Sequence, residues 1–481
     1  MQYNHIFDTN VCFNKLYNRI LNSCVDIAEK KYIIKGRSMM ITYYGKEVFR
    51  MAKAANLGQM LNSFSLFALD EENFDDYYVD VNQARGVDVS RKVVYRFNSS
   101  YGSDIPKKLL LLGHYGCGKT TELYKMSQLL SEKYLIVKYS IAEETDIVNF
   151  DYVDFIFTIL NNIFKIAKSN KLEVSDTVIE KLFTYWHNEE IIEVCNHTKL
   201  ELDSNIETKV SWLSVLSAKI KGVFQTGSET KSTIRTKIEP SLKILISEIN
   251  DLIKSINDAI APKKLLLIVE DLDKLEIPQS EDLFLKHRKT ITSIRINCIY
   301  TFPIYLYYSQ YYNEILSDFD ADELLSIIKV KNRDGTDYNV GIDILKQIVW
   351  KRCDPKLFTD EALDFLVRKS GGSFRDLFTM ISNAALQTAI STDKEIIEIE
   401  QARISFNALK SRKERALKNS HIEILQDVYN DKTKKPIGDD DGNLMELLHS
   451  MNLIEYNGER WCDLHPAIEE YLIEKEYINV I

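Results

Sequence analysis

Four short apolar runs stand out along the first two thirds of the chain. They are Leu109–Leu112, Leu135–Ser140, Leu265–Val269 and Ile296–Phe302. Nearly continuous apolar segments of this length are typical of strands that are buried on both faces of a parallel sheet. Between the second and third runs, apolar residues from Leu242 to Ile256 recur at helical spacing. The pattern predicts an α/β protein with a parallel central sheet and a helical insertion at about residues 150–260.

Helical periodicity dominates on either side of this core. We expect an N-terminal helical extension over residues 1–74, the core over 75–335, and a helical lid over 336–420. In the lid, Thr359 is a predicted N-cap, and Gly371-Gly372 ends the helix that this residue starts. Within the insertion, the Thr- and Ser-rich stretch Thr226–Thr236 predicts a loop.

The C-terminal end of the chain carries a different pattern. Helical segments precede the apolar runs Leu453–Tyr456 and Trp461–Leu464, which flank the two-residue hairpin turn Asn457-Gly458. This order predicts a winged helix over residues 421–481. The segment holds 5 Lys and Arg residues against 14 Asp and Glu residues, so its net charge is −9. Because DNA binding relies on Lys and Arg contacts with phosphate, we expect this module to contact protein instead.

One octapeptide carries specific chemistry. Residues Gly113–Thr120 read Gly-His-Tyr-Gly-Cys-Gly-Lys-Thr, the G-x-x-x-x-G-K-[ST] pattern of a phosphate-binding P-loop, between a predicted strand and the predicted helix Thr121–Leu130. Glycines let backbone N–H groups turn inward around phosphate oxygens, and the helix adds its positive N-terminal end. Lys119 is expected to reach the β- and γ-phosphates, and the Thr120 hydroxyl to bind Mg²⁺. The predicted nucleotide-binding residues are Gly113, Gly116, Cys117, Gly118, Lys119, Thr120 and Thr121.

Paired acids follow the third apolar run, in the sequence Glu270-Asp271-Leu272-Asp273. In P-loop enzymes a carboxylate at this strand end holds Mg²⁺, and a neighbouring carboxylate orients or activates the attacking water. Glu270 and Asp271 are the catalytic candidates, with side chains expected to point in opposite directions. Asp273 is a weaker third candidate. The predicted metal-binding residues are therefore Thr120 and Glu270.

Two further side chains are catalytic candidates near the γ-phosphate. Thr301 ends the fourth apolar run, where a hydroxyl can sense the γ-phosphate or position water. Its structural alternative is a threonine favoured only by strand propensity. Arg375 lies near the start of a helix that begins at about Ser373, where a cation is unfavourable for the helix dipole. This position indicates an anionic partner such as a phosphate, and the alternative is a plain surface arginine.

Composition narrows the class of protein. The 481 residues carry a formal net charge of −10, which argues against a surface that binds nucleic acid throughout. Two basic clusters, Lys231–Lys237 and Lys410–Lys418, are more typical of solvated helix faces or loops than of DNA sites. Seven cysteines without a C-x-x-C pair indicate a reducing compartment and no zinc site. Without an apolar segment of about 18 residues or a signal-peptide pattern, we expect a cytoplasmic protein with no membrane partner.

The order of these motifs resembles AAA+ ATPases, with the origin-recognition initiators and the STAND signalling ATPases as the nearest groups. The likeness covers roughly residues 75–481 and includes Gly-Gly-Ser-Phe-Arg-Asp at residues 371–376. It implies a P-loop NTPase αβα sandwich with ATP and Mg²⁺ as ligands. By this resemblance Lys119 and Thr120 belong to the first nucleotide motif, Glu270 and Asp271 to the second, and Thr301 and Arg375 are the two sensors.

The resemblance leaves three functions open. The first is an ATP-hydrolysing switch, similar to bacterial ATPases of anti-phage defence loci, that acts with a separate protein effector or by self-association. The second is a DNA-binding replication initiator or loader, in which the cluster Lys410–Lys418 and the insertion contact DNA. The third is a scaffold that binds nucleotide with little turnover, because the first arginine after Thr301 is Arg333, without the serine expected of an arginine-finger motif.

Overall fold

The structure is a computed structural model that describes most of the chain. The described residues are 53–66, 68–69, 72–188, 229–391, 393–432, 442–456 and 461–479. The predicted helices before residue 53 and the predicted turn Asn457-Gly458 lie outside this part of the chain. In the described part, no helix combines the length and the apolar character that are needed to cross a membrane.

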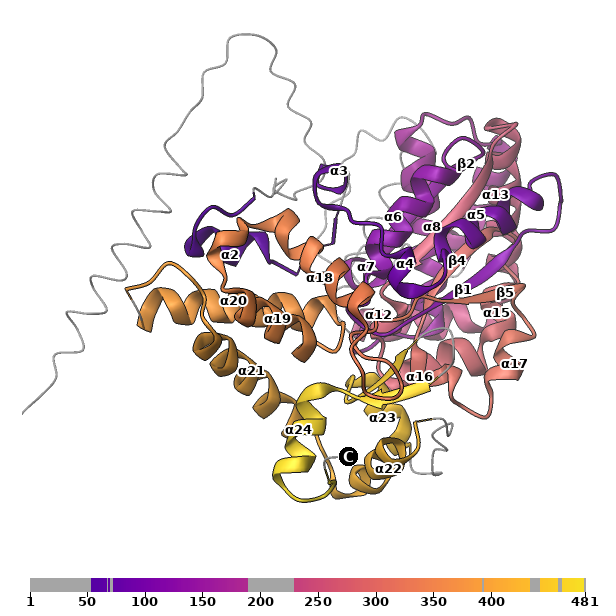
Figure 1. Cartoon of the computed structure of the whole chain (residues 1–481). Coiled ribbons are helices and arrows are strands. Elements are labelled where there is room, and N and C mark those ends of the chain that lie inside the picture. The colour runs from indigo at the N-terminus through magenta and orange to yellow at the C-terminus, as the bar shows by residue number, and fades with distance from the viewer. Residues whose placement is uncertain are drawn as a thin grey trace, which may run out of the picture. The chain divides into compact units, whose positions relative to one another are not determined.

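A parallel sheet of five strands in the order β2-β3-β4-β1-β5 forms the centre of the core (Figure 1). The strands are β1 (Lys108–Leu112), β2 (Tyr134–Ser140), β3 (Lys264–Glu270), β4 (Asn297–Phe302) and β5 (Ala321–Leu324). The four predicted strands are confirmed, and β5 adds an edge strand. In a parallel sheet all carboxyl ends lie at one edge, so the P-loop after β1 and the acids after β3 meet there.

Helices cover both faces of this sheet. Leu109 and Leu111 of β1 pack with α5 (Val89–Ser99) and α6 (Lys119–Leu130), whereas Leu110 and Leu112 face the cluster that contains α8 (Tyr152–Ser169) and α13 (Leu242–Ala259). Successive side chains of a strand point to opposite faces, so a continuous apolar run supplies both interfaces. The αβα sandwich of a P-loop NTPase is confirmed.

The described part of the insertion is helical, but the loop predicted within it is wrong. Besides α8 and α13 it contains α9 (Asp176–Asn188), η1 (Glu239–Ser241) and α12 (Glu229–Ile238), and α12 spans most of the stretch predicted as a loop. Lys231 and Arg235 of α12 pair with the fully buried Asp154 of α8, at 2.7 and 2.5 Å. Ile234 and Ile238 share their helix face and are buried. These tertiary contacts outweigh the low helix propensity of the Thr- and Ser-rich sequence.

The helices expected to form the lid share an apolar cluster with a segment from the expected N-terminal extension. They are α18 (Asn339–Arg352), η4 (Pro355–Leu357), α19 (Asp360–Lys369), α20 (Phe374–Ser391) and α21 (Ile399–Glu414). Thr359 caps α19 by accepting a hydrogen bond from the Ala362 amide at 3.3 Å, as predicted. Helix α2 (Leu57–Ser63) packs on α20, and the ring centres of Phe64 and Phe378 lie 5.5 Å apart in an edge-to-face arrangement.

The C-terminal module has the two predicted antiparallel strands within a helical frame. Its elements are α22 (Asn419–Asn430), α23 (Asn443–His449), β6 (Leu453–Tyr456), β7 (Trp461–Leu464) and α24 (Pro466–Glu474). Helix α24 carries Glu470, which pairs with Lys369 of α19 and Lys410 of α21. Two lysines, one on α19 and one on α21, thus join these helices to the acidic module.

Short elements complete the core and its loops. They are α3 (Phe74–Tyr77), α4 (Asn82–Arg85), α7 (Ile141–Glu144), η2 (Leu272–Lys274), α14 (Ile277–Glu281), η3 (Asp282–Lys286), α15 (Arg288–Thr292), α16 (Ile304–Tyr307) and α17 (Tyr312–Leu316).

Candidate nucleotide-binding site

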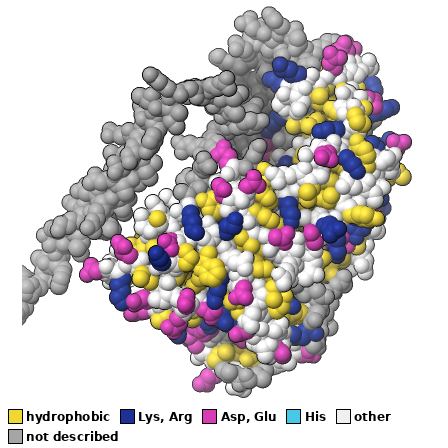
Figure 2. Space-filling view, turned by 45° about the horizontal axis from the view of Figure 1, so that its top comes forward, with side chains coloured by type: hydrophobic (Ala, Val, Ile, Leu, Met, Phe, Trp, Pro, Cys, Tyr) yellow, Lys and Arg dark blue, Asp and Glu magenta, His cyan; other side chains and the backbone are white. Residues whose placement is uncertain are grey.

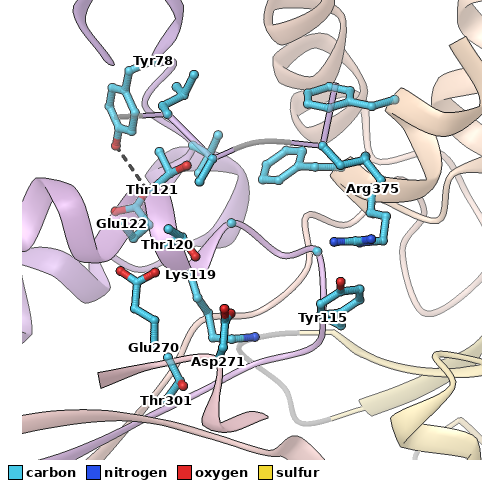
Figure 3. Close-up of a pocket in the computed structure, with 18 of the residues that line it drawn as sticks. Tyr78, Tyr115, Lys119, Thr120, Thr121, Glu122, Glu270, Asp271, Thr301 and Arg375 are labelled. Carbon is cyan, nitrogen blue, oxygen red and sulfur yellow. Dashed lines mark hydrogen bonds between the residues drawn. The ribbon is translucent and has the colours of Figure 1, made fainter. Parts of the chain in front are cut away.

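A cavity of about 360 Å³ opens at the carboxyl edge of the sheet. It is lined by the P-loop, the ends of β3 and β4, the start of α20, and the segment that leads into α4 (Figure 3). Among the predicted site residues it is lined by Gly116, Gly118, Lys119, Thr120, Thr121, Glu270, Asp271, Thr301 and Arg375. Gly113 and the buried Cys117 are not among the residues that line the cavity.

The P-loop needs glycine at the three predicted positions. Gly113, Gly116 and Gly118 have φ angles of +154°, +80° and +96°, which side chains with a Cβ rarely adopt. A Cβ at Gly116 would lie 2.9 Å from the Arg375 Cβ, and one at Gly118 would lie 3.0 Å from the Phe374 ring. The loop therefore has glycines, without side chains, where it packs against the first residues of α20.

Lys119 is buried and points toward the acids. Its Nζ donates hydrogen bonds to the carbonyl oxygens of Gly113 and His114 at 2.7 and 2.8 Å, and lies 2.9 Å from the Asp273 Oδ2. Burial lowers the pKa of Lys119, but the charge and hydrogen bond of Asp273, together with the nearby Cys117 and Asp271, oppose burial and leave the pKa above its usual value. Asp273, the weakest of the three acidic candidates in sequence, is thus the carboxylate in direct contact with the P-loop lysine.

Glu270 ends β3 and is buried beside Thr120. Burial raises the pKa of Glu270, while the Lys138 ammonium, 2.8 Å from the Glu270 Oε1, and a hydrogen bond from the Thr120 hydroxyl oppose this effect. The hydroxyl and the carboxylate predicted to hold Mg²⁺ are therefore neighbours. Lys138 could not be identified from the sequence, because it lies on β2, far from Glu270 in sequence, and only the pairing of β2 with β3 brings the two together.

Asp271 lies just beyond the strand, so the expected alternation along the strand is replaced by a turn. Its φ of +68° lies in the left-handed region, and it is the residue immediately before η2. Its Oδ2 accepts a hydrogen bond from the Ser140 hydroxyl at 2.6 Å, and its Oδ1 lies 2.8 Å from the Lys274 Nζ. The two contacts fix this carboxylate at the cavity wall.

Thr301 is tied to the acidic turn. Its hydroxyl accepts a hydrogen bond from the Leu272 amide at 2.9 Å and lies 3.4 Å from the Val269 carbonyl oxygen. Thr301 is buried and lines the cavity, so it joins β4 to the turn that carries Asp271 and Asp273.

Arg375 reaches the P-loop from α20. Its guanidinium carbon lies 3.8 Å from the centre of the Tyr115 ring, and Figure 3 shows it stacked there across from Lys119. The Arg375 Nε is buried, and no hydrogen-bond partner for it lies within the described residues. A buried donor without a partner in a cavity beside a P-loop fits an anionic ligand.

Arg85 is a buried residue of this site that the sequence analysis did not identify. From α4 it donates hydrogen bonds to the carbonyl oxygens of Ser326 at 3.0 Å and Cys117 at 2.5 Å, and its guanidinium lies 3.6 Å from the Glu122 carboxylate. It therefore joins the P-loop, the P-loop helix and the linker to the lid. A single arginine at the end of a short helix has no local pattern that reveals these contacts.

The P-loop also contacts the C-terminal module. The Glu455 amide of β6 donates a hydrogen bond to the His114 Nε2 at 2.8 Å. Burial, and then the charge of Lys119, lower the pKa of His114 to about 3, so the imidazole is neutral and can accept this bond. The Tyr456 hydroxyl donates to the Gly371 carbonyl at 2.9 Å, close to the start of α20.

The residues present fit a nucleoside triphosphate with Mg²⁺. The bare P-loop backbone, the Lys119 ammonium and the unpartnered Arg375 Nε suit phosphate oxygens. Thr120 and Glu270 provide the hydroxyl and carboxylate oxygens that Mg²⁺ prefers. Bound there, the ion would neutralise charge on the phosphate oxygens.

The chain is similar to several known proteins. Residues 104–298 match the KAP family P-loop domain. Among solved structures, similar chains include Cdc6p from Pyrobaculum aerophilum, with a TM-score of 0.37, 10% identity, and coverage of 87% of this chain and 98% of that chain. The Drosophila ORC bound to DNA has a TM-score of 0.37, 8% identity, and coverage of 90% and 86%. The Aeropyrum pernix ORC1 protein in complex with DNA has a TM-score of 0.34, 10% identity, and coverage of 83% and 94%. No curated protein matches the chain.

Proposed function

We propose that this chain binds ATP with Mg²⁺ and hydrolyses it, and that nucleotide turnover changes how the lid and the C-terminal module sit on the core. The coarser conclusion, a P-loop NTPase domain, stands on the fold and on the family match at residues 104–298. The contact of Arg375 with the P-loop residue Tyr115 carries the rest of the proposal, because it joins lid and phosphate loop at one cavity.

Each site residue has a role in this proposal. Lys119 and the P-loop amides hold the phosphates, and Thr120 and Glu270 hold Mg²⁺. Asp271, fixed by Ser140 and Lys274, orients or deprotonates the attacking water. Thr301 positions the acidic turn, and Arg375 senses the γ-phosphate. Asp273 releases Lys119 when a phosphate replaces it as the partner of the ammonium.

The contacts of the C-terminal module support a switch rather than an isolated hydrolase. The Glu455 amide binds the side chain of the P-loop residue His114, and the Asp376 carboxylate, next to Arg375, lies 3.3 Å from the His465 Nε2 of this module. A rearrangement at the phosphates therefore reaches the module through two contacts. We extend the proposal to a winged-helix module that controls a separate protein effector, as in the anti-phage defence ATPases that the chain resembles.

The DNA-binding alternative is weakened by the fate of the basic cluster Lys410–Lys418. Lys410 lies 2.6 Å from the Glu474 carboxylate, and Lys418 lies 2.6 Å from that of Glu446. Lys413 is largely buried beside Asp376, at 3.8 Å. Three of the five cations are thus used within the chain, and Figure 2 shows basic side chains interspersed with acidic ones on the visible face. DNA-phosphate contacts would have to break these ion pairs.

Steady-state ATPase activity of the purified protein over a concentration series, with and without DNA, tests the proposal. Asp271→Asn is expected to bind ATP and to lose turnover, whereas Asp258→Asn, the same change at an exposed site on α13, should match the wild type. If Asp271→Asn keeps full turnover, the assignment of the water-activating residue is wrong, and Glu270→Gln is the next variant.

The same series separates the alternatives. Turnover that rises with protein concentration would indicate a site shared between subunits. Stimulation by DNA that disappears at high salt would favour the initiator function. ATP binding with negligible turnover in the wild type would favour the scaffold.

A further inference from the structure

One end of the cavity has a chemistry that the phosphate site does not use. Away from the P-loop it is lined by apolar and aromatic side chains from the segment before α4 and from α18 and α20, together with one guanidinium. These residues are Leu66, Leu69, Tyr77, Val79, Ile348, Arg352, Phe374 and Phe378. Apolar walls with few polar groups are typical of a pocket for a flat organic group.

A series of contacts leads from the P-loop to this end. The Phe374 ring lies 3.0 Å from the position of a Cβ on Gly118. The ring centres of Phe374 and Phe378 are 6.4 Å apart, and the Arg352 guanidinium lies 4.8 Å from the Phe378 ring. The Phe374 and Phe378 rings thus lie between the P-loop and Arg352. A base is joined to the phosphates through a ribose, so this is the end of the cavity at which the base would lie.

The Arg352 side chain is poorly neutralised for a buried cation. It is 6% exposed, and no carboxylate in the described part of the chain forms an ion pair with it. Its Nη1 donates to the Ile348 carbonyl of its own helix at 3.3 Å, and its guanidinium lies 5.8 Å from the Tyr77 ring. Burial lowers the pKa of Arg352 to about 10, so it remains charged at neutral pH. Aromatic rings offset part of the cost of burying this charge, but they do not accept its in-plane N–H groups.

We propose that Arg352 recognises the base of the bound nucleotide by donating a hydrogen bond to a ring acceptor of a purine, with Phe378 and Tyr77 holding the guanidinium in plane. Both purines carry the imidazole nitrogen N7 as an acceptor, and arginine donates to the N7 of guanine in many protein–DNA complexes. A pyrimidine lacks that ring, and its own acceptors, such as O2 and N3 of cytosine, lie at other positions on the base, so it cannot offer N7 to the guanidinium. This inference rests on the proposed nucleotide site and adds its base preference.

Competition against a fluorescent ATP analogue tests the inference on the full chain. The competitors are ATP, 7-deaza-ATP, CTP and inorganic tripolyphosphate, and the variants are Arg352→Met and Arg352→Lys. We expect Arg352→Met to weaken ATP binding at least tenfold, which corresponds to about 1.4 kcal/mol, and to leave tripolyphosphate binding unchanged. Arg352→Lys keeps the charge but loses the planar donors, so it should show a smaller loss in the same direction.

Lys351→Met is the matched control. This variant removes the same charge from the same helix. Lys351 itself is exposed, and its Nζ donates a hydrogen bond to the Asp76 carbonyl oxygen at 3.2 Å outside this cavity. It should bind all competitors as the wild type does. If Arg352→Met does not fold, as judged by its melting temperature, the wild type decides: ATP must bind at least tenfold more tightly than CTP and tripolyphosphate.

Three outcomes would overturn the inference. One is an Arg352→Met variant that folds and binds ATP like the wild type. Another is an equal loss for ATP and CTP, which would place Arg352 at the ribose. A third is a wild type without preference for ATP over CTP. If the wild type binds neither ATP nor tripolyphosphate, the proposed nucleotide site itself fails, and this is distinguishable from failure at the base.

Discussion

Replacing Lys119 should destabilise the fold itself, not only nucleotide binding. Lys119 and Asp273 side chains are 7% and 5% exposed, and their charged atoms are 2.9 Å apart. At this separation and an effective dielectric constant of about 20, the attraction is about 6 kcal/mol before the cost of desolvation. Removing one partner of a buried pair leaves an uncompensated charge and typically costs about 3–5 kcal/mol. We expect this loss for Lys119→Met.

The single and double variants should not be additive. Asp273→Asn leaves Lys119 with its two carbonyl acceptors, so we expect a smaller cost, about 1.5–3 kcal/mol. Lys119→Met/Asp273→Asn removes both charges, and its destabilisation should be below the sum of the singles by at least about 1 kcal/mol. Lys263→Met, at an exposed lysine on the opposite edge of the sheet, is the control and should change stability by less than about 0.5 kcal/mol.

Urea unfolding without nucleotide, followed by far-UV circular dichroism, measures these differences. The reasoning is refuted if Lys119→Met lies within about 1 kcal/mol of the wild type, or if the costs of the two single variants simply add. If it holds, the inactivity of a P-loop lysine variant cannot be assigned to lost phosphate contacts alone. Lys119→Arg, which keeps a cation beside Asp273, then becomes the better variant for activity measurements.

Three further predictions concern the P-loop and the contacts of the C-terminal module. Gly116→Ala, at φ +80° and with its Cβ 2.9 Å from the Arg375 Cβ, should destabilise the fold by about 1–3 kcal/mol and weaken ATP binding, as thermal unfolding and titration would show. The pKa of His114 is lowered to about 3 by burial and then by a nearby lysine, so the unfolded chain takes up this proton first, and stability should fall as the pH drops from about 6.5 toward 3. His114→Gln keeps an acceptor but no proton site, so urea midpoints at pH 7, 6 and 5 should depend less on pH than in the wild type, and an unchanged dependence would contradict the assignment. Lys410→Glu should lower the melting temperature by the equivalent of about 1 kcal/mol because it loses the pairs with Glu474 at 2.6 Å and with Glu470 at 3.2 Å. Lys410→Glu/Glu474→Lys should regain part of that loss; no regain would mean that the pair of residues 410 and 474 does not hold the module.

Local patterns accounted for much of the fold and for the centre of the candidate site. The strand β1 and the P-loop are adjacent in sequence, and their residue types state their roles: apolar residues for a doubly buried strand, and glycines for left-handed backbone. The acids after β3 were predictable for the same reason. The prediction of a loop at Thr226–Thr236 was wrong because the helix formed there depends on contacts with Asp154, which lies far away in the sequence.

The site residues that the sequence analysis did not identify also come from distant segments. Arg85 ends the short helix α4 before β1, Lys138 lies on the neighbouring strand β2, and Arg352 ends α18. None of these residues belongs to a sequence motif, because each gains its role from a partner that only the fold brings close to it. The ranking of Asp273 below its neighbours was likewise changed by a single contact with Lys119.

The sequence by itself determined that this chain forms a parallel α/β core with a phosphate-binding loop, because apolar periodicity and glycine-dependent backbone are properties of consecutive residues. Only the tertiary structure decided which lysine neutralises which acid and which cations remain for a ligand. Ion pairing depends on distance and burial in space. The cluster Lys410–Lys418 looked solvated in sequence, but Lys410 and Lys418 pair with carboxylates of the C-terminal module. By contrast, the buried Arg352 and Arg375, whose Nε is buried, lie at the cavity without a carboxylate partner in the described part of the chain.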